Sequence, residues 1–251
     1  MLNWFRNSRR KRILSKPWPP AWSLILDENV GHFKGLSSVE KNKLTSITRV
    51  MVSEKNWEAY SGLVMTDEIK VTIAGTAALM LLGVEDFYFD RVDTIIVFPQ
   101  PVQRTNRGGL VQGQQSRHSG EAWQNGQVVL SWEDVVNDSR NPSDGRNLVI
   151  HEFAHCLDGL DGEMGGSLTF GDDATTRRWR RVCESEFEAL SIAAQHGRKT
   201  LLDHYGATNQ AEFFAVASET FFEKPQQLKH EHPELFELLV KYYRLNPISW
   251  I

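Results

Sequence analysis

The sequence is poor in cysteine and has no long uninterrupted apolar run. Two cysteines, Cys156 and Cys183, occur in 251 residues. This is too few for a disulfide framework and indicates a reducing compartment. The longest apolar stretch, residues 71–84, is broken by threonine and glycine and is too short to cross a bilayer. We therefore expect a globular, cytoplasmic protein without a membrane span.

Acidic residues are absent from the first 16 positions, so the net charge of −4 leaves −10 for the remainder. An arginine pair resembles part of an export signal. However, it is followed by prolines rather than by a hydrophobic segment, so export is not expected. We predict a basic, flexible arm over residues 1–20 and a single domain over 21–251. The acidic body argues against direct nucleic-acid binding. The bases of the arm are Arg6, Arg9, Arg10, Lys11, Arg12 and Lys16.

The strongest chemical signal lies in residues 147–158, which read NLVIHEFAHCLD. His151 and His155 are four apart, so on an α-helix both imidazoles lie on one face, with Glu152 beside the first. Two imidazoles and a neighbouring carboxylate suit a zinc ion, which in catalytic sites keeps one position for water. The flanking residues are apolar and predict a buried helix, in which ionisable groups need a function. The alternative is an exposed helix with solvent-facing histidines.

Other patterns predict further helices and a few strands. Ser37 and Glu40 form a capping box, and Thr66 is a second helix cap. The strand at 128–132 could be an exposed sheet edge that holds a peptide backbone, or an ordinary interior strand. Helices are predicted at 37–57, 66–83, 179–195 and 235–242, and strands at 92–99, 110–112 and 128–132.

The two ends of the motif helix carry turn signals. Residues 141–145 form a turn before it, and we predict that Ser143 or Asp144 caps its first turn. Gly159 is predicted to end it. The Gly- and Asp-rich segment 160–173 is long enough to form a mobile rim over the site.

A catalytic zinc needs a third protein ligand, and the chain offers local and distant candidates. Asp158 and Asp161 are local, but the glycine that a local third ligand requires three residues after His155 is missing. Asp158, one turn after His155, is instead predicted to accept an imidazole N–H and to fix the tautomer.

The distant candidates are Glu212 and Glu219, which are seven apart on an apolar helix predicted at 209–223. They lie on nearly the same face, so either could reach the metal. Glu212 could instead cap its own helix together with Asn209, and Glu219 could instead form a buried salt bridge or support a ligand. The residues alone leave this choice open.

Several motifs together resemble one family from about residue 20 to the carboxyl end. The quoted residues are HEFAH followed by Asp158, the segment DHYGA at 203–207, AEFFAVASETFF at 211–222, GEAW at 120–123 and VVLSW at 128–132. They are similar to the glucose-regulated metallopeptidases, also called Mlc titration factor A proteins. The resemblance implies an α+β fold: a mostly helical, zincin-type metallopeptidase with a small mixed sheet next to the HExxH helix.

The resemblance also implies roles for residues of this chain. His151, His155 and Glu212 would bind one zinc ion per chain, Glu152 would be the catalytic base, and Tyr205 would lie beside the metal, where its phenol could stabilise an oxyanion.

Two functions follow from the same resemblance. One is an aminopeptidase-like enzyme that acts on small peptide substrates and has a role in regulating glucose uptake through a Mlc-like transcription repressor. The alternative is a non-catalytic protein that sequesters such a repressor. The strongly basic arm departs from the family pattern and leaves the amino-terminal partner surface open.

Overall fold

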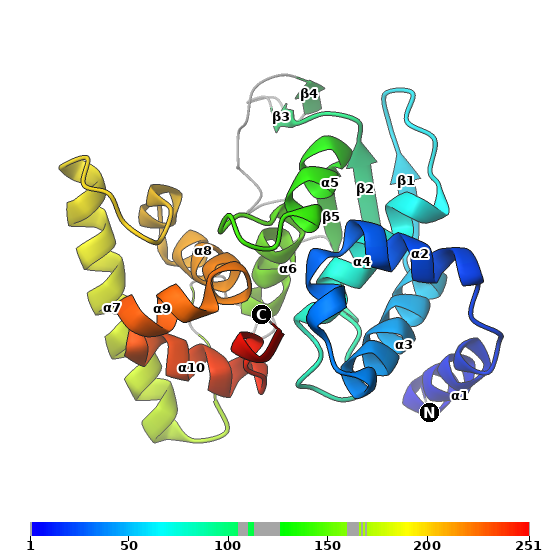
Figure 1. Cartoon of the computed structure of the whole chain (residues 1–251), viewed down its shortest axis with the longest axis horizontal. Coiled ribbons are helices and arrows are strands. Elements are labelled where there is room, and N and C mark those ends of the chain that lie inside the picture. The colour runs from blue at the N-terminus through cyan, green and yellow to red at the C-terminus, as the bar shows by residue number, and fades with distance from the viewer. Residues whose placement is uncertain are drawn as a thin grey trace.

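The computed structural model describes residues 2–104, 110–112, 126–159, 166, 168 and 170–250, and most of these are helical (Figure 1). The α-helices are α1 (Leu2–Leu14), α2 (Pro20–Asn29), α3 (Ser38–Glu54), α4 (Asp67–Leu79), α5 (Trp132–Arg140), α6 (Leu148–Asp158), α7 (Asp173–Gln195), α8 (Gln210–Glu223), α9 (Pro225–Glu231) and α10 (Pro233–Tyr243). Short 3₁₀ helices are η1 (Gly31–Gly35), η4 (His204–Ala207) and η5 (Pro247–Trp250). The strands are β1 (Asn56–Ala59), β2 (Thr94–Phe98), β3 (Val102–Arg104), β4 (Leu110–Gln112) and β5 (Gln127–Ser131).

Three of the strands form a parallel sheet in the order β1-β2-β5. The central strand β2 is almost wholly buried, as its β-branched run predicts. The antiparallel partners β3 and β4 form a separate pair. The small sheet beside the motif helix is therefore parallel within the described residues, where a mixed sheet was expected. Parallel neighbours need crossovers rather than hairpins, and the connection from β1 to β2 contains helix α4.

Local capping signals place the first long helices. The side chain of Ser37 accepts from the backbone N–H of Glu40, and the Glu40 carboxylate accepts from the Ser37 N–H, which completes the predicted capping box of α3. Thr66 caps α4 through the N–H of Ile69, also as predicted. However, α3 ends at Glu54, and Trp57, expected near its end, lies in β1 opposite Ile95 of β2.

The motif helix α6 lies in the middle of the molecule. Helix α8 packs against it on one side, and α4, α5 and β5 pack against it on the others (Figure 1). Phe153 on α6 is fully buried, and the centre of its ring lies 4.6 Å from the centre of the Phe89 ring. The alternative of an exposed motif helix is therefore excluded. Within the described ranges, no helix is long and apolar enough to cross a membrane.

The basic amino-terminal segment is ordered into α1, which packs against α3. Arg10 is buried, and its guanidinium contacts the carboxylates of Glu54 at 2.8 Å and Asp90. Arg10 is thus not the solvated base that the charge pattern indicated, because two acids of the body neutralise it. The division of the chain at residue 20 stays a prediction. The rim predicted at 160–173 falls largely outside the described residues.

Candidate metal centre

The first turn of α6 is capped by a residue that the sequence argument missed. Asn147 is buried, and its side-chain oxygen accepts from the N–H of Ile150 at 3.2 Å. The prediction that Ser143 or Asp144 is the cap is wrong. The Asp144 carboxylate instead closes its own turn, because it accepts from Asn141 and from the N–H of Arg146, each at 2.8 Å. Asparagine immediately before an apolar helical run was the signal available.

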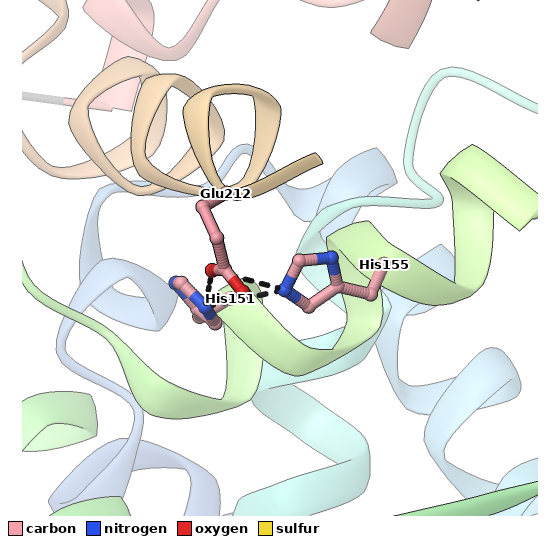
Figure 2. Close-up of side chains that lie close together, drawn as sticks. All are labelled: His151, His155 and Glu212. Carbon is pink, nitrogen blue, oxygen red and sulfur yellow. Dashed lines mark hydrogen bonds and ion pairs between the residues drawn. The ribbon is translucent and has the colours of Figure 1, made fainter. Parts of the chain in front are cut away.

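From this helix the two motif histidines point toward the first turn of α8 (Figure 2). Nε2 of His151 lies 3.3 Å from Nε2 of His155. One carboxylate oxygen of Glu212, Oε2, lies 3.0 Å from the first nitrogen and 3.4 Å from the second. All three side chains are buried. Two nitrogens and one oxygen therefore converge on a single point between α6 and α8.

Helix α8 presents Glu212 there because its own cap needs only the backbone of that residue. Asn209 accepts from the N–H of Glu212 at 2.9 Å, so the predicted cap exists. The Glu212 side chain does not reach back to complete a capping box but turns to the histidines. One residue thus serves the helix with its backbone and the site with its carboxylate.

The second distant candidate, Glu219, meets the other side of His151. Its Oε1 lies 2.7 Å from Nδ1 of His151, and its Oε2 accepts from the N–H of Asn147 at 2.7 Å. Because Nδ1–H bonds to Glu219, Nε2 is the ring nitrogen that faces Glu212, where it can carry a proton or bind a metal. Both oxygens of Glu219 are therefore already used, and the structure brings Glu212, not Glu219, to the point where the two imidazoles converge.

The electrostatics of the cluster favour a bound cation. Burial alone would lower the pKa of His151, but the carboxylates of Glu219 and Glu212 outweigh it and raise that pKa. Burial alone would raise the pKa of Glu212, but hydrogen bonds from His151 and His155 outweigh it and hold that pKa well below its usual range. A carboxylate kept ionised in a buried site needs a positive partner, and a divalent metal can replace the proton in that role.

A layer of further carboxylates surrounds the start of α6. Asp138 of α5 accepts from the N–H of Leu148 at 2.9 Å, and burial raises its pKa to about 6. Glu223 of α8 accepts from the side-chain amide of Asn147 at 3.1 Å, and burial raises its pKa to about 9. Asp138 thus bonds a backbone N–H that the first turn of a helix leaves without an internal partner, and Glu223 holds the side chain that caps the same turn, so both fix the helix that carries the histidines. Sequence reasoning found neither residue.

The remaining predicted site residues lie close to the cluster. Glu152 is buried and near enough to raise the pKa of His151 further. Tyr205 lies on η4, and its ring centre is 5.9 Å from that of His151. Gly206 lets η4 pack closely on α7 and α8, because a Cβ there would lie 3.1 Å from Leu190 and 3.3 Å from Val216. The roles of Glu152 and Tyr205 stay predictions.

Asp158 lies one turn after His155. It is buried at the end of α6, and its Oδ2 accepts from the N–H of Gly166 at 3.0 Å. At the metal centre, Nδ1 of His151 bonds the carboxylate of Glu219. The role of Asp158 as a supporting acceptor stays a prediction.

The three converging donors fit a zinc ion by chemistry and by spacing. Neutral imidazole nitrogen and carboxylate oxygen are ligands that zinc accepts. Tetrahedral zinc with bonds of about 2.0–2.1 Å holds neighbouring ligand atoms about 3.3–3.4 Å apart. The observed separations of 3.0, 3.3 and 3.4 Å are close to this, so little rearrangement would be needed.

Comparison with known proteins agrees with this site. The family described as glucose-regulated metallo-peptidase M90 matches residues 5–244. An uncharacterized protein of Synechocystis sp., slr2042, is 36% identical over 245 residues, which cover 96% of this chain and 89% of the relative. The protein named Mlc titration factor A of Klebsiella pneumoniae is 31% identical, covering 93% and 87%, and that of Yersinia pestis is 28% identical, covering 98% and 90%. With a buried His-His-Glu cluster and a match along nearly its whole length, the chain belongs to the glucose-regulated metallopeptidase family.

Proposed function

We propose that this chain is a zinc-dependent peptidase that cleaves small peptide substrates in an aminopeptidase-like manner in the cytoplasm. The convergence of His151, His155 and Glu212 on one buried point carries the proposal. Membership of a metallopeptidase family supports it. Both cysteines are buried and free, which supports a reducing compartment.

The residues of the site would divide the work of hydrolysis. His151, His155 and Glu212 would hold zinc, which when bound makes its water acidic and polarises the peptide carbonyl. Glu152 would accept the proton of the attacking water and pass it to the leaving amine. The phenol of Tyr205 would donate a hydrogen bond to the developing oxyanion. Glu219 would keep His151 in the tautomer that leaves Nε2 free for the metal.

The strand β5 offers a place for the substrate backbone. It is one of the two outer strands in the described order β1-β2-β5, and it packs against α6. An edge strand can pair with the main chain of many different peptides, because that pairing does not depend on side chains. This supports the edge alternative for the strand predicted at 128–132.

The test is substitution of the proposed base. Glu152→Gln keeps the shape of the side chain but cannot accept the proton, so we expect stoichiometric zinc and a kcat reduced by about 10²- to 10⁴-fold. Zinc content and hydrolysis of a panel of aminoacyl and internal peptide reporters should be measured together. Glu188→Gln, an exposed change on α7, is the matched control. Full activity in zinc-loaded Glu152→Gln would contradict the assignment.

A second function is favoured by the names of the relatives, of which several are called Mlc titration factor A. We propose that the chain also binds a Mlc-like transcription repressor. The two functions separate with the same variant. A binding role should survive Glu152→Gln, whereas a regulatory peptidase should leave cleaved repressor with wild type and none with the variant.

A further inference from the structure

The amino-terminal helix α1 has an inward face whose charges are matched by the body. Arg10 contacts Glu54 and Asp90, and Arg6 contacts Asp90 at 3.3 Å. The guanidinium of Arg10 also lies 4.3 Å from the centre of the Tyr88 ring. These contacts attach one side of α1 firmly to the molecule.

The opposite face of α1 is apolar and basic at once, and it is exposed. Trp4 and Phe5 are 70% and 65% exposed, although both are large apolar side chains. Helical spacing places Trp4, Phe5 and Arg12 on the side away from Arg10, with Arg9 and Lys11 on the two flanks of that side. These three bases are exposed and form no ion pair with the described part of the chain. We call Trp4, Phe5, Arg9, Lys11 and Arg12 the outer face of α1.

The body holds this face in a fixed place. Arg49 of α3 donates to the carbonyl oxygen of Leu14 at 3.0 Å and to that of Lys16, which ties down the last turn of α1. In Figure 1, α1 lies at the periphery of the molecule, beside α3. One face of α1 therefore packs on the body, and the outer face is open to solvent.

We propose that the outer face of α1 binds the surface of a membrane that contains anionic phospholipids. Its three free bases match the charge of such a surface, and α1 contains no acid that would oppose it. Indole and phenyl rings insert at the level of the lipid head groups, which removes them from water. One face supplies both contributions, and a single weak signal would not hold a protein on a membrane.

The aromatic pair favours lipid over nucleic acid as the polyanion. The rings of Trp4 and Phe5 meet edge to face, with centres 5.1 Å apart and planes at 77°. Two adjacent rings can insert together at the head-group level, whereas proteins that bind single strands hold them in a positively charged groove, and the outer face of α1 is the convex surface of one helix. Binding would place the chain at a membrane surface without any span, and it does not depend on peptidase activity.

The test is sedimentation of the full-length protein with vesicles of phosphatidylcholine alone or mixed with phosphatidylglycerol. We expect binding to the mixed vesicles only, and weaker binding at high salt. Arg9→Gln/Lys11→Gln/Arg12→Gln should reduce affinity for mixed vesicles by about tenfold or more. Trp4→Ala/Phe5→Ala should also reduce it and should remove fluorescence quenching by brominated lipid acyl chains.

The matched control is Arg177→Gln/Arg180→Gln/Arg181→Gln, which removes three exposed positive charges from another helix, α7. This control should bind mixed vesicles like wild type. Equal losses in the control and the α1 triple variant would overturn the proposal, because net charge alone would then explain binding. Equal binding to neutral vesicles, or no vesicle binding by wild type, would also overturn it. Tighter binding to a short DNA than to mixed vesicles, measured by competition between the two, would overturn it as well. Circular dichroism melts should confirm that every variant is folded.

Discussion

The two ends of α8 both face α6, but they use the same residue type for different work. In the first turn, one oxygen of Glu212 lies 3.0 Å from Nε2 of His151 and 3.4 Å from Nε2 of His155. Two turns later, one oxygen of Glu219 bonds Nδ1 of His151, and the other accepts from a backbone N–H at the start of α6. Glu223, one turn further on, holds the cap of α6 through Asn147.

The difference arises from what each end of α8 meets on α6. The carboxyl end of α8 lies beside the amino end of α6, where backbone N–H groups without helical partners donate to carboxylate oxygens. The amino end of α8 meets side chains one and two turns into α6, where no backbone donor is open. Spacing along α8 thus puts Glu212 and Glu219 on one face. The direction of α6 decides their roles: Glu212 meets the imidazoles as a candidate ligand, and Glu219 meets the amino end of α6 as a supporting residue.

The largest predicted effect distinguishing the two ends of α8 is a pH dependence of the unfolding free energy caused by Glu223. An unfolded glutamate titrates near pH 4.3, whereas burial raises the folded pKa of Glu223 to about 9. Between these values the native state keeps a proton that the unfolded state has lost, so this group destabilises the fold increasingly as pH rises. Glu223→Gln should remove that slope, a change on the order of a few kcal/mol in unfolding free energy.

Urea unfolding of wild type and Glu223→Gln across this pH range measures the effect. Exposed Glu188→Gln is the control and should track wild type. Equal slopes for wild type and Glu223→Gln would show that Glu223 is not kept protonated.

A smaller effect is expected where the two ends meet, at Glu219. Glu219→Ala removes the acceptor for Nδ1–H of His151 but none of the three converging donors. Zinc should still bind, with affinity lower by about 10- to 100-fold, as for other supporting carboxylates. Competition with a chromophoric chelator measures this. A complete loss of zinc would make Glu219 a ligand and erase the distinction between the two ends.

The smallest effect concerns the cap alone. Asn147→Ala removes the bond to the N–H of Ile150 and should lower the unfolding free energy by about 1–2 kcal/mol. Ser143→Ala, at an exposed position, should change it by less than about 0.5 kcal/mol. Thermal melts of the two variants decide which residue caps α6, and equal losses would restore the turn residue as a cap.

Local signals in the sequence predicted much of this fold. The caps at Ser37, Thr66 and Asn209 each join a side chain to a backbone N–H three residues away, so the printed sequence contains both partners. The motif helix ends at Asp158 with Gly159 as its C-cap, next to the predicted stop, and it is buried, as its apolar residues predicted. Most of α4, β2 and β5 also follows from periodicity.

Long-range partners could not be predicted in this way. Glu219 and Glu223 lie 72 and 76 residues from Asn147, so nothing local reveals that they hold the same helix end. The strand β1 is only four residues long and is stabilised by pairing with β2 rather than by its own pattern. Arg10 looked solvated because its two acids, Glu54 and Asp90, are distant in sequence.

The most direct test of the account is zinc content by elemental analysis of wild type, Glu212→Ala and Glu219→Ala after dialysis against the same zinc-limited buffer. The account predicts about one zinc per chain in wild type, little in Glu212→Ala, and an intermediate amount in Glu219→Ala. A wild type without stoichiometric metal, or a Glu212→Ala protein that keeps its zinc while Glu219→Ala loses it, would contradict the assignment of the first turn of α8 to the metal.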